Sequence, residues 1–202
     1  MVWSCLVSIL PGMAQTEKLT DYVNPFVGTD GYGNVYPGAQ IPFGGIQISP
    51  DTDSRFYDAA SGYKYNHLTL MGFSLTHLSG TGIPDLGDFL FIPGTGEMKL
   101  EPGTHEDPDQ GYRSRYSHDK EWASPNYYAV ELADYGVKAE MTSGVRSGMF
   151  RFTYPESDNA FIMIDMNHTL WQSCEWSNLR MINDSTITGY KLVTSRLLSQ
   201  RS

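Results

Sequence analysis

The sequence predicts an all-β fold in which two antiparallel sheets pack face to face. Aromatic residues are frequent, with 13 Tyr, 9 Phe and 4 Trp, and such residues pack well on pleated sheets. The chain also contains 20 Gly and 11 Pro, which interrupt helices. Apolar and polar residues alternate in several short stretches, whereas no stretch sustains apolar residues at helical spacing. With 202 residues, 40% of them hydrophobic, the chain can form one domain with a substantial core.

The first 14 residues form a short apolar stretch that ends in small residues, as the core and cleavage site of a signal peptide do. Cleavage after Ala14 would fit this pattern, although the stretch lacks basic residues at its start and is consistent with an incomplete signal peptide. The alternative is a frayed N-terminus. We therefore expect a secreted or periplasmic protein.

Residues 21–51 are dense in turn-forming pairs and predict a long ordered loop region, which either lines a site or closes one end of the sandwich. Strand-like runs follow, and a polar stretch at 94–122 predicts an irregular connection. The clearest alternation lies between 127 and 154, where two short breaks predict a three-strand antiparallel meander. The other expected strands are 45–49, 68–75, 89–92, 160–166 and 185–191.

Charge and motifs exclude several functions. The net charge is −9 and Lys and Arg are not clustered, which disfavours a nucleic-acid partner. Cys5 lies in the leader, so Cys174 has no partner for a disulfide framework. Nothing after the leader is long enough to span a bilayer. The signatures of serine hydrolases, zinc proteases and nucleotide-binding loops are missing. Asn167-His-Thr169 matches the N-glycosylation acceptor pattern.

The densest polar motif spans residues 72–88, where a strand runs into a glycine-rich loop. Hydroxyl and carboxylate groups in this loop suit the hydrogen-bonding groups of a sugar, and its glycines allow close approach of the backbone. The candidate polar residues are His77, Ser79, Thr81, Asp85 and Asp88. For His77 the alternative is a buried ring bonded to a backbone carbonyl, and for Asp88 it is a turn or strand cap.

No catalytic residue and no metal ligand is assigned in this chain. Asp85 and Asp88 are three residues apart in a flexible loop, and this spacing does not define the separation that a pair of glycosidase carboxyls requires. Asp51-Thr-Asp53 has some likeness to a calcium loop but lacks the Gly and the downstream Glu of an EF-hand.

Several blocks, read together, resemble the N-terminal signature of glycoside hydrolase family 92, the calcium-dependent exo-acting α-mannosidases. These blocks lie at 21–29 (DYVNPFVGT), 36–44 (YPGAQIPFG), 47–52 (QISPDT), 61–63, 72–74, 76–82 (THLSGTG), 87–88, 127–142 and 151–155. The resemblance implies a β-sandwich followed by a larger (α/α)₆ barrel, with the active site at their junction. It also implies that the barrel, which is absent here, supplies the catalytic carboxyls and the calcium ligands.

By this resemblance the sandwich contributes substrate contacts from two loops. The complete candidate set is Phe26, Gly28, His77, Ser79, Gly80, Thr81, Gly82, Asp85 and Asp88. The family usually has His at the position of Leu75 and often Cys after the glycine-rich motif, where this chain has Ile83-Pro84, so fine specificity is expected to differ.

The resemblance predicts a β-sandwich at 21–191 and a divergent or truncated tail at 192–202. The parent enzyme is expected to hydrolyse terminal α-1,2-mannosides with inversion, acting on mannose-containing glycans together with its (α/α)₆ domain. The fragment alone is expected to be inactive. A stand-alone carbohydrate-binding module and a purely structural domain are the alternatives.

Overall fold

The computed structural model describes residues 17–54 and 59–194. Its strands are β1 (Ser49–Asp51), β2 (Thr69–Leu70), β3 (Gly72–Ser74), β4 (Leu90–Thr95), β5 (Ser114–Arg115), β6 (Glu121–Ser124), β7 (Tyr127–Leu132), β8 (Val137–Ser143), β9 (Gly148–Thr153), β10 (Ala160–Asp165), β11 (Ser173–Asn183) and β12 (Thr186–Thr194). Short 3₁₀ helices are η1 (Leu19–Tyr22), η3 (Pro108–Gln110) and η4 (His118–Lys120). The described residues contain no α-helix, which confirms the predicted all-β class.

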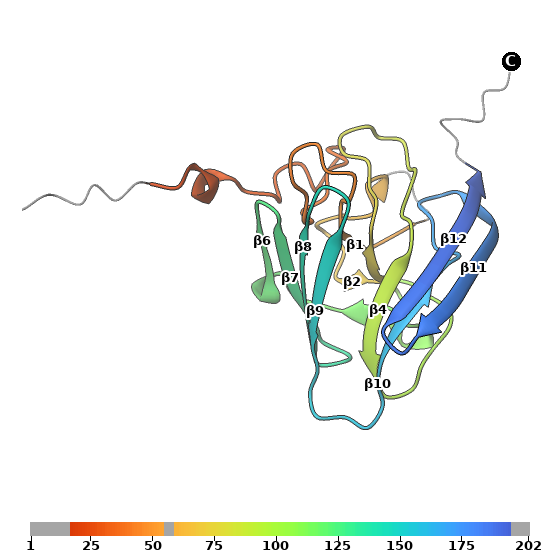
Figure 1. Ribbon diagram of the computed structural model, residues 1–202. Helices are drawn as coiled ribbons and strands as arrows, with labels where there is room; N and C mark the ends of the chain where they lie inside the picture. The colour runs from red at the N-terminus through yellow and green to blue at the C-terminus, as the bar shows by residue number, and fades with distance from the viewer. Residues whose placement is uncertain (1–16, 55–58, 195–202) are drawn as a thin grey trace, which may run out of the picture.

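Two four-stranded sheets form the sandwich. One has the order β1-β3-β4-β10 and the other the order β6-β7-β8-β9, and every pairing in them is antiparallel. Figure 1 shows β6 to β9 on one side of the molecule and β4 and β10 on the other. β2 and β5 make a small separate sheet, and β11 and β12 make a two-stranded hairpin outside β10. The predicted meander at 127–154 is confirmed as β7, β8 and β9.

The main core lies between the two sheets. Phe73 of β3 is fully buried, and its ring lies 6.5 Å from that of Phe150 and 6.4 Å from that of Phe152, both on β9. Alternate residues of β7 and β8, among them Tyr128 and Val130, point into the same cluster. The alternation of apolar and polar residues in the sequence therefore indicates which side chains of this sheet face the core.

Other strands differ from the sequence prediction. The run 68–75 is divided into β2 and β3, and the run 45–49 contributes only Ser49 to a strand. β5 lies inside the stretch 94–122 that was expected to be irregular, β6 begins at the end of that stretch, and β11 was not predicted. The alternation of β11 is broken by register shifts between Cys174 and Trp176 and between Met181 and Asn183, which explains why its sequence lacks a clean period.

The domain boundaries predicted near the two ends of the chain stay predictions. The expected signal peptide at 1–14 lies outside the described residues. The expected domain boundary at 191 falls within β12, which continues to Thr194, and the rest of the predicted tail lies outside the described residues. Within the described residues, no helix is long and apolar enough to cross a membrane.

Candidate functional site

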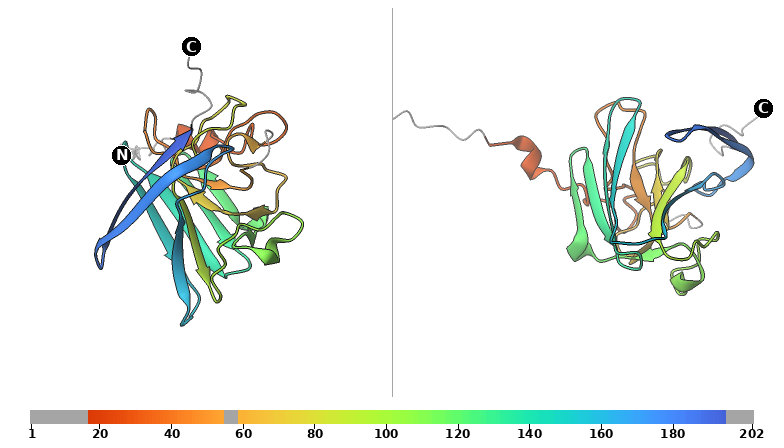
Figure 2. Two further views of the ribbon diagram at one scale, coloured as in Figure 1. Left: turned by 90° about the vertical axis from the view of Figure 1, so that its right-hand side faces the viewer. Right: turned by 60° about the horizontal axis from the view of Figure 1, so that its bottom comes forward.

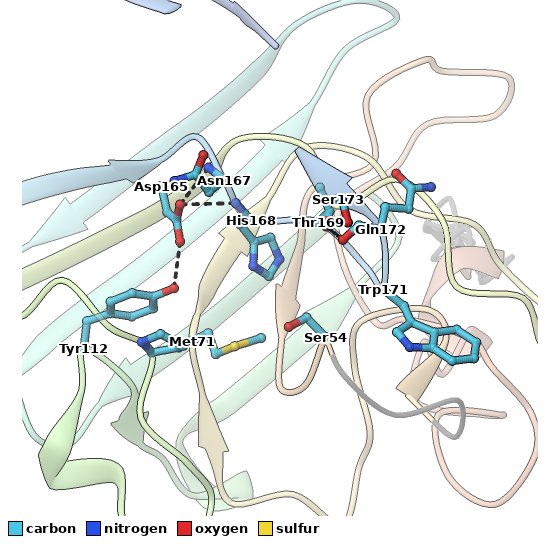
Figure 3. Close-up of a pocket in the computed structure, with 11 residues that line it drawn as sticks. Ser54, Met71, Tyr112, Asp165, Asn167, His168, Thr169, Trp171, Gln172 and Ser173 are labelled. Carbon is cyan, nitrogen blue, oxygen red and sulfur yellow. Dashed lines mark hydrogen bonds between the residues drawn. The ribbon is translucent and has the colours of Figure 1, made fainter. Parts of the chain in front are cut away.

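A cavity of about 560 Å³ opens beside the connection between β10 and β11 (Figure 3). Its volume is in the range of sites that bind small ligands. The residues that line it are Ser54, Met71, Pro102, Tyr112, Asp165, Asn167, His168, Thr169, Trp171, Gln172 and Ser173. Most of them come from one short connection, so the conformation of this connection determines the shape of the cavity.

Asp165, the last residue of β10, organises the connection. One carboxylate oxygen accepts the backbone N–H groups of Asn167 at 2.8 Å and His168 at 3.2 Å, and the other accepts the hydroxyl of Tyr112 at 2.9 Å. These are the local hydrogen bonds with which Asp favours a turn over a continuing strand. The turn directs the His168 ring toward Ser54 and Met71 at the cavity (Figure 3).

His168 belongs to a buried cluster in which one carboxylate contacts two imidazole rings, and this cluster holds its ring in place. Asp51 of β1 is fully buried; one of its oxygens lies 2.7 Å from Nε2 of His168 and the other lies 2.8 Å from Nε2 of His77. Burial alone would raise the pKa of Asp51, but the charge of His77 and the hydrogen bonds from His168 and His77 outweigh this effect and lower the pKa. Asp51 is therefore an acceptor for both rings.

The contact with Asp51 determines which ring nitrogen of His168 carries a proton. Because a carboxylate can only accept, Nε2 of His168 carries a proton, and in the neutral ring Nδ1 is left as a hydrogen-bond acceptor. Asn167 is exposed at the rim, and Trp171 is 39% exposed at the far side. The cavity thus combines hydrogen-bonding groups with an aromatic surface, which are the features that suit a sugar ring.

The backbone near the cavity is strained at large residues. Trp171 has a φ of 63°, Leu86 of 71° and Phe89 of 58°, in the left-handed region that bulky side chains rarely occupy. The N–H of Leu170 donates to the carbonyl of Leu86 at 2.9 Å, so these segments are neighbours. Strain of this kind concentrates at functional sites.

The two loops proposed from the sequence do come together. The N–H of Gly80 donates to the carbonyl of Asn34 at 2.7 Å, which joins the glycine-rich loop to the loop after Gly28. Ser79 and Thr81 are exposed, and Gly82 is partly buried. Gly28 has a φ of 85°, and Phe26 packs with its ring 5.8 Å from that of Tyr65. A sugar contact by these residues stays a prediction.

His77 is buried, and its ring nitrogens have protein partners. Nδ1 lies 2.7 Å from the carbonyl oxygen of Gln47, while Nε2 contacts Asp51 and also lies 3.0 Å from Oγ of Ser74. This is the alternative considered for His77, a buried ring bonded to a backbone carbonyl. His77 positions Asp51, whereas its direct contact with a sugar stays a prediction.

The two acidic residues of the glycine-rich loop also have partners. Asp85 is buried and accepts the N–H of Leu86 at 2.8 Å. Asp88 accepts the hydroxyl of Thr76 at 2.8 Å and lies 3.1 Å from Nζ of Lys191 on β12. Asp88 therefore links the loop to the β11–β12 hairpin, a tertiary role close to the strand-cap alternative.

Sequence reasoning did not find the β10–β11 connection. Asn167 and His168 were noted only as part of a glycosylation pattern. A signal was available, since Asp165 lies near the end of the predicted strand 160–166 and the two polar residues whose N–H groups bond to it follow that strand.

The described residues do not bring three His, Cys, Asp or Glu side chains together in an arrangement that would hold a metal ion.

Comparison with known proteins decides the family. The model of the glycosyl hydrolase family 92 N-terminal domain matches residues 22–201. The chain belongs to glycoside hydrolase family 92. The family resemblance and the sandwich fold expected from the sequence are both confirmed.

Solved members of family 92 share the fold. A GH92 α-mannosidase from Bacteroides thetaiotaomicron is 99% identical with a TM-score of 0.88, over 89% of this chain and 24% of that one. An inverting GH92 mannosidase from the same species is 27% identical with a TM-score of 0.60, over 74% of this chain and 20% of that one. An uncharacterised secreted glycosidase of Arthroderma benhamiae is 30% identical over 139 residues, which are 68% of this chain and 17% of that protein. The chain therefore spans about a quarter or less of these relatives.

Proposed function

We propose that this chain is the N-terminal domain of an exo-acting α-mannosidase and forms one wall of its glycan-binding pocket. The observation that carries the proposal is the 99% identity to a solved GH92 α-mannosidase over most of this chain. In the proposal the parent enzyme hydrolyses terminal α-1,2-mannosides with inversion. The calcium ion and the catalytic carboxyls belong to the (α/α)₆ domain.

The contents of the cavity support a binding role. A mannoside presents hydroxyls at its edge and apolar C–H groups on its faces. Asn167 and His168 offer hydrogen bonds to hydroxyls, and Trp171 offers an apolar surface. The buried Asp51 holds His168 in one orientation, so this group is preorganised for binding.

The same cavity does not support chemistry by this chain alone. An inverting glycosidase needs an acid and a base about 6.5–9.5 Å apart on either side of the scissile bond. Among the described residues that line the cavity, Asp165 is the one with a carboxyl group, and both of its oxygens are engaged by Tyr112 and by backbone N–H groups. In the proposal the pair comes from elsewhere in the parent enzyme.

Hydrolysis assays test this proposal. The purified 202-residue chain, supplied with calcium, is expected to release no mannose from an aryl α-mannoside or from α-1,2-mannobiose. The full-length Bacteroides thetaiotaomicron enzyme that is 99% identical over the aligned part serves as the positive control. Release of mannose by the folded chain alone would contradict the proposal that the catalytic carboxyls lie in the (α/α)₆ domain. Failure of the full-length enzyme to hydrolyse any α-mannoside would contradict the proposed activity.

One observation favours a second function, a stand-alone carbohydrate-binding module. The cavity formed by this chain already brings together an exposed amide side chain, Asn167, and an aromatic side chain, Trp171. Such a module would bind a mannoside by itself, whereas a single wall of a larger pocket would not.

Secretion is part of the proposal as well. It is supported by the apolar leader that resembles a signal peptide and by the secreted glycosidase of Arthroderma benhamiae among the relatives. The partners proposed for the chain are mannose-containing glycans and the (α/α)₆ domain of the same enzyme.

A further inference from the structure

The atoms around His77 determine the charge of its ring. Nδ1 lies 2.7 Å from the backbone carbonyl oxygen of Gln47, and Nε2 lies 2.8 Å from Oδ1 of Asp51. Both oxygens can only accept a hydrogen bond, because neither carries a hydrogen. A neutral imidazole has a single N–H group, so it would satisfy one oxygen and present a lone pair to the other. The contacts of His77 therefore indicate an N–H group on both nitrogens, which is the positively charged imidazolium form.

The hydroxyl of Ser74 does not remove this requirement. Its Oγ lies 3.0 Å from Nε2 of His77 and could donate to that nitrogen if the nitrogen were bare. The lone pair of the bare nitrogen would then also face the carboxylate of Asp51. The side chains of His77 and Asp51 are both 0% exposed, so water does not screen this repulsion.

The proton between His77 and Asp51 resides on the imidazole. The pKa of an ordinary histidine is about 2.6 above that of an ordinary aspartate, so the imidazole is the stronger base. Oδ2 of Asp51 also accepts a hydrogen bond from Nε2 of His168 at 2.7 Å, and this second donor favours the charged carboxylate. Asp51 and His77 thus form a buried ion pair.

His168, the other ring on Asp51, needs no charge. Among the described residues its ring makes one hydrogen bond, from Nε2 to Oδ2 of Asp51, and the neutral ring with its proton on Nε2 satisfies this contact. We call Asp51, His77 and His168 the histidine cluster. One carboxylate and one imidazolium sum to zero charge, whereas a second imidazolium would leave a net charge buried, which is costly.

The groups packed around the histidine cluster do not alter this charge count. The ring of Tyr36 lies 5.0 Å from that of His77, and burial raises the pKa of Tyr36, so its phenol stays uncharged. Nζ of Lys191 donates to the backbone carbonyl of His168 but is balanced by Asp88, which lies 3.1 Å away. The other charged groups nearby make hydrogen bonds of their own: Asp165 and Arg113.

The histidine cluster joins two distant segments of the chain. His77 lies at the neck of the glycine-rich loop, where it forms a β-bridge with Leu86. His168 lies on the β10–β11 connection, which leads from the sandwich to the β11–β12 hairpin that stands off from its two layers (Figure 2). Because Asp51 contacts both rings, the charge at the neck of the loop acts on a residue that lines the cavity.

We propose that His77 is a positioning residue whose positive charge neutralises Asp51 and thereby keeps His168 neutral, with Nδ1 as a hydrogen-bond acceptor toward the cavity. His77 does not line the cavity, so it acts through the other two members of the histidine cluster. The role in mannoside binding rests on the proposed function, whereas the charge of His77 rests on its contacts.

Nitrogen NMR of the 202-residue chain with isotope-labelled histidine tests the charge assignment, since protonated and bare ring nitrogens differ in chemical shift. At neutral pH we expect two protonated nitrogens in His77, and in His168 a protonated Nε2 with a bare Nδ1. His105 is the internal control, because its Nδ1 faces a donor, NH1 of Arg113 at 3.4 Å, and should be bare. A bare nitrogen in His77, or a doubly protonated His168, would overturn the proposal.

A pair of variants of the same chain tests the link between the two rings. His77→Gln leaves Asp51 without a cationic partner, so we expect His168 to take up a second proton and the Nδ1 signal to move to the protonated position. Ser74→Ala is the matched control, because it removes a contact to the same nitrogen without changing any charge. A bare Nδ1 of His168 in both variants, or a protonated one in both, would contradict the link. The wild-type spectrum decides the charge of His77 even where circular dichroism shows that a variant is unfolded.

Kinetics of the full-length Bacteroides thetaiotaomicron enzyme test the consequence for binding. His77→Gln is expected to lower kcat/KM for α-mannosides about 10-fold, mainly through KM, because an acceptor in the cavity becomes a donor. Ser74→Ala should leave kcat/KM unchanged. Normal kinetics of His77→Gln, combined with the expected spectra, would overturn the positioning role. A wild-type enzyme that hydrolyses no α-mannoside would instead overturn the proposed function and leave the charge assignment intact.

Discussion

Asparagine in place of Asp51 is expected to lower the free energy of unfolding by about 3–5 kcal/mol, the usual cost of breaking a buried ion pair. Both carboxylate oxygens accept hydrogen bonds from histidine rings, at 2.8 Å from His77 and 2.7 Å from His168. An asparagine supplies one acceptor and directs an NH₂ group at the other ring. A Cβ on Gly62 would lie 2.0 Å from Oδ1 of Asp51, so backbone packs closely against the site and leaves little room to adjust.

Urea denaturation of the chain measures this loss. Asp109→Asn is the control, because Asp109 is 74% exposed and its pair with Arg115 should contribute less than about 1 kcal/mol. The prediction would be wrong if the two variants unfolded at the same urea concentration. Because folding lowers the pKa of Asp51, its contribution is complete above the pKa of an unfolded aspartate and is lost as the pH falls toward the folded value. The difference between Asp51→Asn and the wild type should therefore shrink in acid.

Removal of the Trp171 side chain is expected to have the largest effect on activity. In the full-length Bacteroides thetaiotaomicron enzyme, Trp171→Ala should lower kcat/KM for α-mannosides about 30-fold, which corresponds to about 2 kcal/mol for a central aromatic contact. The physical reason is that Trp171 supplies the aromatic surface of the cavity and lies on the strained connection that also carries His168.

Trp122→Ala is a matched control for this experiment. Trp122 is 44% exposed, close to the 39% of Trp171, but it lies on β6 in the other sheet, where Nζ of Lys138 sits 5.6 Å from its ring centre. Its loss should leave kcat/KM unchanged. Equal effects of the two substitutions would show that the cavity does not face the substrate.

The meander could be predicted because its pattern depends on residues that are close together in the sequence. In β7 and β8 one face is apolar and buried, so the alternation appears directly in the sequence. In β6 the side chains alternate in the same way, but the polar residue faces the core and the apolar residue faces outward. Glu121 points inward and Trp122 points outward, because the buried carboxylate accepts the hydroxyls of Tyr63 at 2.9 Å and Tyr128 at 2.6 Å. A partnered buried charge reverses the expected polarity of a strand.

None of the nine residues proposed from the sequence lines the cavity, and the reason is distance along the chain. The glycine-rich loop attracted attention because its polar residues are close in sequence. The partners of Asp51 are 26 and 117 residues away from it, and no local pattern relates these positions. His77 was proposed from the sequence as a sugar contact, but its ring nitrogens bond to Gln47 and Ser74, which only the fold brings to it.

A calorimetric titration of the isolated chain with α-1,2-mannobiose tests the central claim, that the domain holds one wall of a glycan pocket and not a complete site. We expect no saturable heat up to millimolar sugar from a chain shown to be folded by circular dichroism. Saturable binding at a ratio of one sugar per chain, abolished by Trp171→Ala and kept in Trp122→Ala, would contradict the claim and show that these 202 residues form a self-sufficient sugar-binding module.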